Sequence, residues 1–142
     1  MFVLPLKASG AQTASTTGSA VQLSRDTYEE VIFVLDVTAL ATQAGDLLDV
    51  YIDVSPDGVT WFNSTHFTQI LGNGAAAKIA AKVTKKGDFA DPDAVLAITA
   101  DAAAGVVRQL GIMPFVRYRS VIVDASTDDA SFTYSLTGYY IE

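Results

Sequence analysis

The sequence predicts an all-β fold, an antiparallel β-sandwich or jelly roll of seven to nine short strands. Three observations predict it. Several segments alternate apolar and polar residues with a period of two, turn-forming residues recur about every ten positions, and no segment has the length and period of a helix that could cover a sheet. An antiparallel sheet without helices buries its apolar face against a second sheet. The 142 residues match one domain, and 50% hydrophobic residues are enough for a core.

The N-terminal segment contains two different patterns. Residues 1–7 are apolar and include Pro5. They predict a short first strand rather than a signal peptide, because no positive residue precedes them, and we expect a protein made without export machinery. Residues 8–20 contain only small or polar side chains and no periodic face. They are expected to form a long loop or a flexible arm, because they bury too little surface to offset the entropy of ordering.

The next two strand candidates differ in their predicted burial. Residues 31–37 are almost continuously apolar and rich in β-branched side chains, which predicts a strand covered on both faces. Residues 46–54 alternate, with apolar side chains on one face and Asp49, Tyr51 and Asp53 on the other. This alternation predicts a strand that is buried on one face only.

A turn follows this second strand. Residues 55–58 have the sequence Ser-Pro-Asp-Gly, in which Pro56 and Asp57 suit the central turn positions and Gly58 tolerates a positive φ. Trp61 is expected to fold back over the resulting hairpin.

The rest of the chain continues the strand pattern. The sequence Gly-Asn-Gly at 72–74 marks another hairpin, and the alanines at 101–104 favour a short helical turn that Gly105 ends. Both faces of the segment 115–125 are partly apolar, which predicts a central strand with one end less buried than the other. Further strands are expected at 61–71, 78–84 and 132–140.

The composition excludes several function classes. Sixteen acidic and nine basic residues give a formal net charge of -7, which argues against a reader of the nucleic-acid backbone. The chain has no cysteine, so disulfides, thiolate metal sites and cysteine nucleophiles are excluded. His66 is the single histidine, and no glycine-flanked serine accompanies it. We therefore expect a surface or edge histidine whose replacement changes little, no cofactor and no enzymatic activity.

Acidic residues offer two further candidate sites. Asp88, Asp91 and Asp93 crowd one segment and could ligate calcium, although their spacing does not fit the twelve-residue calcium loop and a solvated acidic loop is the alternative. Asp49 and Asp53 share a strand face, but four residues at about 3.3 Å each place them too far apart for glycosidic hydrolysis.

The basic residues form a local pattern in this acidic chain. Arg117 and Arg119 point to the same face of one strand, and Arg108 precedes them. We expect either a small basic patch that binds an acidic partner or a solvated face.

Several of these features together resemble small β-sandwich structural proteins of tailed bacteriophages. They are the strand, turn and tryptophan at 50–62, His-Phe-Thr-Gln at 66–69, the arginine-containing strand at 116–123 and the last strand at 131–138. The resemblance covers residues 28–71 and 112–142. It implies a non-enzymatic virion protein, assembled in the host cytoplasm, and most of all a capsid decoration or cement protein. A component of the neck, tail or head fibre is the alternative.

The same resemblance implies the partners. A decoration protein binds the major capsid protein or another virion protein, commonly as a homo-oligomer that lies across joints between subunits. Nucleic acid and membranes are not expected partners. Sandwich edges and the segment 8–20 are the expected contact elements.

A carbohydrate-binding module is the alternative from a different class. In that case Trp61 and Phe62 would supply a stacking surface and Asn63 hydrogen bonds.

Overall fold

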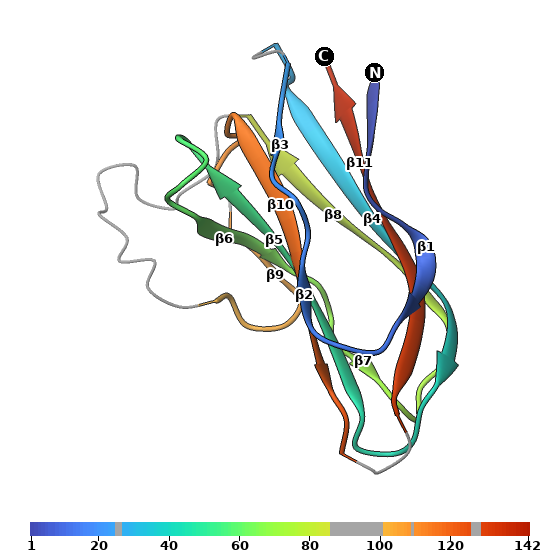
Figure 1. Cartoon of the computed structure of the whole chain (residues 1–142). Coiled ribbons are helices and arrows are strands. Elements are labelled where there is room, and N and C mark those ends of the chain that lie inside the picture. Colours follow the sequence, from blue (N-terminus) through green and yellow to red (C-terminus); the bar gives the residue numbers. More distant parts are fainter. Residues whose placement is uncertain (25–26, 86–100, 109, 126–128) are drawn as a thin grey trace.

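The computed structural model describes residues 1–24, 27–85, 101–108, 110–125 and 129–142. In these residues the chain forms two antiparallel sheets that pack face to face, and no helix occurs (Figure 1). The prediction of an all-β sandwich is therefore confirmed. Seven of the strands have five or more residues, and four more consist of two residues each.

The four-stranded sheet combines both ends of the chain with two internal strands. Its order is β1 (Phe2–Gln12), β11 (Ser131–Ile141), β4 (Glu30–Ala41) and β8 (Ala77–Thr84). The C-terminal strand β11 lies between β1 and β4, and the two termini lie at the same end of the sandwich (Figure 1).

The seven-stranded sheet is built around two long central strands. Its order is β2 (Thr16–Thr17), β10 (Phe115–Val123), β5 (Leu47–Ser55), β6 (Phe62–His66) and β9 (Val106–Val107), with β3 (Val21–Gln22) also paired to β10 and β7 (Ile70–Leu71) to β5. The central position predicted for the segment 115–125 is confirmed, because β10 has partners on both sides. Val121 and Val123, at its far end, are exposed as expected.

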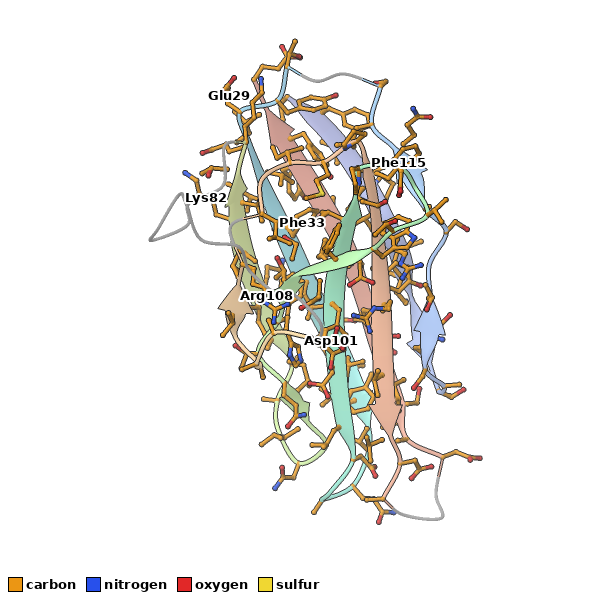
Figure 2. All side chains as sticks on the ribbon, turned by 90° about the vertical axis from the view of Figure 1, so that its left-hand side faces the viewer. Glu29, Phe33, Lys82, Asp101, Arg108 and Phe115 are labelled. Atoms are coloured by element: carbon orange, nitrogen blue, oxygen red, sulfur yellow. The ribbon has the colours of Figure 1, made fainter. Side chains whose placement is uncertain are left out.

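Side chains with a period of two form the core between the sheets. Alternate residues of each long strand are buried there, including Phe33 and Leu35 of β4, Phe132 of β11, and Val50 and Ile52 of β5. Phe33, which Figure 2 labels, is only 2% exposed. The alternation that the sequence shows in these strands is thus the alternation between the core and the outer faces.

The prediction of a loop or arm at 8–20 is wrong in its main point. Residues 8–12 continue β1 along β11, and Thr16 and Thr17 pair with β10, so this segment crosses from one sheet to the other. The N–H of Gly18 donates to the carbonyl of Tyr118 at 2.9 Å, and a Cβ at Gly18 would lie 2.1 Å from the Tyr118 ring. Backbone pairing and the small size of the residues, rather than an apolar face, hold the segment.

The predicted burial of the two long strands is reversed. The strand β4 is not covered on both faces, because its outward residues Ile32 and Val34 are only half-buried. The strand β5 is buried on both faces, including its polar residues Asp49 and Asp53. The outer face of the four-stranded sheet is open, whereas that of the seven-stranded sheet is covered by polar side chains and by the segment 101–108.

The turn after β5 matches its prediction and is fastened by side chains. Gly58 has a φ of 76°, and the Ser55 hydroxyl accepts hydrogen bonds from the N–H groups of Asp57 and Gly58 at 3.3 and 2.8 Å. The Asp57 carboxylate accepts from the N–H groups of Thr60 and Val59 at 2.6 and 2.8 Å. These bonds hold the pKa of Asp57 well below its usual range. The N–H groups of Thr60 and Val59 have the largest effect, and the hydroxyls of Ser55 and Thr60 add to it.

The low pKa of Asp57 predicts a pH-dependent contribution to stability. A carboxyl with a depressed folded-state pKa stabilises the fold above its unfolded pKa of about 3.9 and loses this contribution as the pH falls toward the folded value. We expect Asp57→Asn to unfold at a lower urea concentration than wild type at pH 7, with the gap narrowing below about pH 4. Urea midpoints from pH 7 to pH 2 test this, and a gap independent of pH would contradict it.

Candidate functional site

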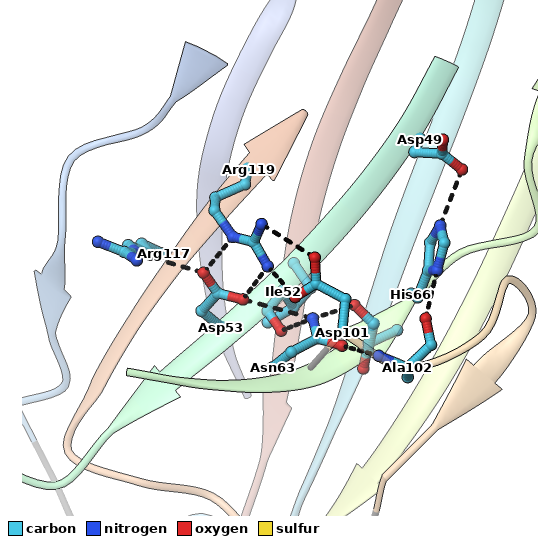
Figure 3. Close-up of polar contacts among 10 residues, drawn as sticks. Asp49, Ile52, Asp53, Asn63, His66, Asp101, Ala102, Arg117 and Arg119 are labelled. Carbon is cyan, nitrogen blue, oxygen red and sulfur yellow. Dashed lines mark hydrogen bonds and ion pairs between the residues drawn. The ribbon is translucent and has the colours of Figure 1, made fainter. Parts of the chain in front are cut away.

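The main cluster of polar side chains lies on the outer face of the seven-stranded sheet. Asp49, Tyr51 and Asp53 project outward from β5, and side chains from β6, β10 and the segment 101–108 cover them (Figure 3). Figure 2, which looks onto this face, shows Asp101 in front of the sheet. We call this group of residues the outer-face network.

Asp53 is the centre of the outer-face network. Its side chain is only 3% exposed, and it receives hydrogen bonds from Nε and Nη2 of Arg119 and, at 3.3 Å, from Nε of Arg117. In the ladder between β10 and β5, Arg117 is the direct partner of Asp53 and Arg119 is two residues further along the same face. A buried carboxylate needs such partners, because removing a charge from water is costly.

Arg119 links this carboxylate to the covering segment. Its Nη2 also donates to Oδ1 of Asp101 at 2.6 Å, and its guanidinium lies 4.6 Å above the centre of the Tyr51 ring. Hydrogen bonding to Asp53 is the main cause that raises the pKa of Arg119, Asp101 adds to it, and desolvation opposes it. Desolvation, followed by the carboxylate of Asp49, raises the pKa of Tyr51.

Asn63 is a second link between the sheet and the covering segment. Its amide nitrogen donates to Oδ1 of Asp53 and to the carbonyls of Ile52 and Thr65, at 3.2 to 3.3 Å. Its amide oxygen accepts the N–H of Ala102 at 2.9 Å. The bulge at this point of the pairing between β5 and β6 places the side chain under the segment.

His66 is buried, so the expectation of a surface or edge histidine is wrong. The residue is 7% exposed, its Nδ1 lies 2.7 Å from the carbonyl of Ala102, and its Nε2 lies 2.8 Å from Oδ1 of Asp49. Tyr51 stacks on the ring, with 4.2 Å between centroids, and Gln69 donates to both oxygens of Asp49. Both ring nitrogens of His66 therefore lie within hydrogen-bond distance of an oxygen atom.

The segment 101–108 is held against β6 by backbone bonds as well. The N–H of Gly105 donates to the carbonyl of His66 at 2.9 Å, and that of Arg108 to the carbonyl of Ser64 at 2.7 Å. The N–H of Val106 donates to the carbonyl of Ala103 at 3.2 Å, which closes a turn that contains Gly105 with a φ of 78°. The predicted helical turn at 101–104 is not formed. Val106 and Val107 then pair with β6.

The predicted basic patch is organised differently from the expectation. The side chains of Arg117 and Arg119 do share a face, but Asp53 binds both of them, and Arg117 also lies 4.2 Å above the Trp61 ring. Arg108 lies on the covering segment just after β9 (Figure 2). Arg117 and Arg119 therefore face acidic groups of their own chain.

The residues expected to bind a glycan are also used within the fold. One face of the Trp61 ring meets the Arg117 guanidinium, Phe62 packs against the core, and Asn63 is buried with its hydrogen bonds satisfied. The Asn63 amide and one face of the Trp61 ring are thus already engaged within the fold.

The described residues contain no cluster of three or more histidine or acidic residues that could hold a metal ion. The calcium hypothesis for Asp88, Asp91 and Asp93 concerns residues outside the described part of the chain.

Of the residues that build the outer-face network, sequence reasoning missed Asp101, Ala102 and the role of Asn63. One signal was present, because opposite charges occupy the outward positions of β5 and β10.

The position of His66 predicts that its replacement is costly. In His66→Ala the Asp49 carboxylate and the Ala102 carbonyl both lose the ring nitrogen within hydrogen-bond distance, so we expect a loss of about 2 kcal/mol of unfolding free energy. The amides of Gly105 and Arg108 are expected to exchange hydrogen faster, because the segment loses one anchor. Urea unfolding and amide exchange measure both effects. Thr133→Ala, a half-exposed control on the other sheet, should leave the amides unchanged, and unchanged exchange in His66→Ala would contradict the prediction.

No protein-family model matches this chain, and no curated protein matches it in sequence. In the described part of the chain there is no helix that could span a membrane.

Proposed function

We propose that the protein is a non-enzymatic structural component of a phage virion, most of all a capsid decoration protein that stabilises the head. The observation that carries this proposal is the open outer face of the four-stranded sheet, where two uncharged and largely apolar cross-strand rows run over β1, β11 and β4. In one row Val3 lies beside Tyr139 and Tyr139 beside Ile32. In the next row Val34 lies between Thr137 and Ala80.

Charged groups border these rows, and Lys82 of β8 ends the first of them as the direct cross-strand partner of Ile32. Lys78 pairs with Asp36 at 3.0 Å and Lys82 with Glu30 at 2.6 Å, all on β8 and β4. An uncharged strip bordered by paired charges has the composition of a protein-protein interface, in which apolar residues form the centre and polar residues the rim. The sequence of β4 is that of a strand with two covered faces, and a partner on this sheet would provide the second cover.

The outer-face network supports the same proposal. Both ring nitrogens of His66 already have partners, and Asp53 is occupied by two arginines. These groups stabilise the sandwich and retain no free acid, base or nucleophile for a substrate.

The edges of the four-stranded sheet are poor contact elements, in contrast to the expectation from the sequence. The edge strand β1 contains Pro5 and two irregularities of register, and the edge strand β8 carries Lys78 and Lys82. Proline, bulges and lysines hinder the addition of a further strand. We therefore infer that the protein docks through the sheet face, on an uncharged strip of the major capsid protein.

Cosedimentation with phage heads assembled without the protein tests this proposal. Wild type is expected to bind, and Val34→Glu, which places a charge in the apolar strip, is expected to lose at least about tenfold in affinity. Val59→Glu is the control, because Val59 is 81% exposed on the turn between β5 and β6. Absence of wild-type binding would overturn the function, and equal binding of Val34→Glu would overturn the docking face.

A further inference from the structure

A pocket of about 390 Å³ opens between the two sheets at the end of the sandwich that holds the termini. It shares no lining residue with the outer-face network. Leu23 and Tyr28 form its buried part, Ile112 and Met113 form a half-buried wall, and Ser24 and Lys85 are exposed at its rim. Its size is within the range of pockets that enclose small molecules.

Backbone hydrogen bonds fix both walls of this pocket. On the side of the seven-stranded sheet, the N–H of Leu23 donates to the carbonyl of Pro114 at 2.8 Å. On the side of the four-stranded sheet, the N–H of Lys85 donates to the carbonyl of Glu29 at 2.7 Å. The mouth of the pocket is thus already formed, which lowers the entropic cost of binding.

Tyr28, which lines the pocket, belongs to an aromatic cluster. The ring of Tyr28 lies 5.1 Å from that of Tyr140 and 6.0 Å from that of Phe2. Packed rings of this kind give a rigid apolar surface against which a flat ligand can stack.

Among the described residues, the rim supplies one cation. The ammonium of Lys85 lies 3.3 Å from Oε1 of Glu29, and both side chains are largely exposed. An exposed pair of this kind contributes little, so an anion can replace the Glu29 carboxylate at small cost. We propose that the pocket binds a small amphipathic anion, with an apolar group of one or two aromatic rings between the sheets and its anionic group at Lys85.

Two fluorescent probes that share an aromatic skeleton test this proposal. Anilinonaphthalene sulfonate has an anionic sulfonate group, and phenylnaphthylamine is the neutral counterpart that lacks this group. Both are expected to bind the folded protein. Lys85→Gln should weaken the sulfonate by about two- to fivefold, and Glu29→Gln should strengthen it by a similar factor, as the energy of an exposed ion pair predicts. Neither substitution should change the affinity of the neutral probe.

Matched variants distinguish probe binding in the pocket from probe binding elsewhere on the protein. Lys82→Gln is the control for charge, because Lys82 forms the corresponding pair with Glu30 further along β8 (Figure 2). Met113→Gln replaces an apolar wall residue with one of similar shape and should weaken both probes about three- to tenfold, as the loss of apolar contact predicts. Thermal unfolding of each variant, compared with wild type, tests whether the sandwich is intact.

The outcomes are distinct. Failure of both probes to bind, or binding that Met113→Gln leaves unchanged, overturns the pocket. A sulfonate affinity that responds equally to Lys85→Gln and Lys82→Gln overturns the role of Lys85 and the anionic class of ligand. None of these results bears on the binding of phage heads, which is measured on the face of the four-stranded sheet.

Discussion

Replacing Arg119 with alanine is expected to lower the free energy of unfolding by about 3 kcal/mol, the cost of removing one partner from a buried ion pair. Asp53 would keep only the 3.3 Å contacts of Arg117 and Asn63 in a site where its side chain is 3% exposed. Asp101 would lose its partner as well, so the covering segment would loosen. Urea unfolding at neutral pH measures the loss.

Arg117→Ala is the matched control for this prediction. It removes an arginine from the same strand face but leaves both bonds between Arg119 and Asp53, so we expect a loss of about 1 kcal/mol. Arg119→Lys should recover only part of the loss, because an ammonium cannot bind Asp53 through two nitrogens and Asp101 at once. Equal effects of Arg117→Ala and Arg119→Ala would show that Arg119 is not the main partner of Asp53.

Replacing Gly72 with alanine is expected to cost about 3 kcal/mol or more, at the upper end of the range for overpacking. A Cβ there would lie 2.1 Å from the carbonyl oxygen of Gln43 and 2.8 Å from the Cβ of Asp46. The turn cannot move away easily, because the N–H of Gly72 donates to the Asp46 carbonyl at 2.8 Å and its own carbonyl accepts from Thr42 at 2.6 Å.

Gly10→Ala is the control for the substitution at Gly72. A Cβ at Gly10 meets no atom within 4 Å, and the residue lies in the edge strand β1. We expect a change of less than about 0.5 kcal/mol, or a slight stabilisation from the lower entropy of the unfolded chain. Thermal and urea unfolding compare the two variants, and similar losses in both would show that close packing at Gly72 is not the cause.

The buried carboxylate of Asp46 explains why this region is so closely packed. Its two oxygens accept the N–H groups of Gln43 at 2.7 Å and of Ala125 at 3.0 Å, so one side chain joins the turn before β5 to the end of β10. With the Gly72 bond, three separate loops meet at this residue at one end of the sandwich. The opposite end, which has the pocket, lacks such a link among the described residues.

The sequence alone determined the fold class and the inner faces of the strands. Alternation in residues such as Leu48, Val50 and Ile52 is a local property, since neighbouring side chains of a strand point to opposite faces whatever the tertiary context. The Ser-Pro-Asp-Gly turn is equally local, because Gly58 needs no distant partner to adopt a positive φ.

Only the tertiary structure decided what covers the outer faces. Ile32 and Val34 predicted a covered strand and Asp49 and Asp53 an open face, yet the burial is the reverse. Polar residues can be buried when distant residues neutralise them, and those partners come from β10 and from a segment about fifty residues away in the chain. These distant partners cannot be predicted from the sequence of one strand. For the same reason, the burial of His66 and the ordering of residues 8–20 could be seen only in the assembled sandwich.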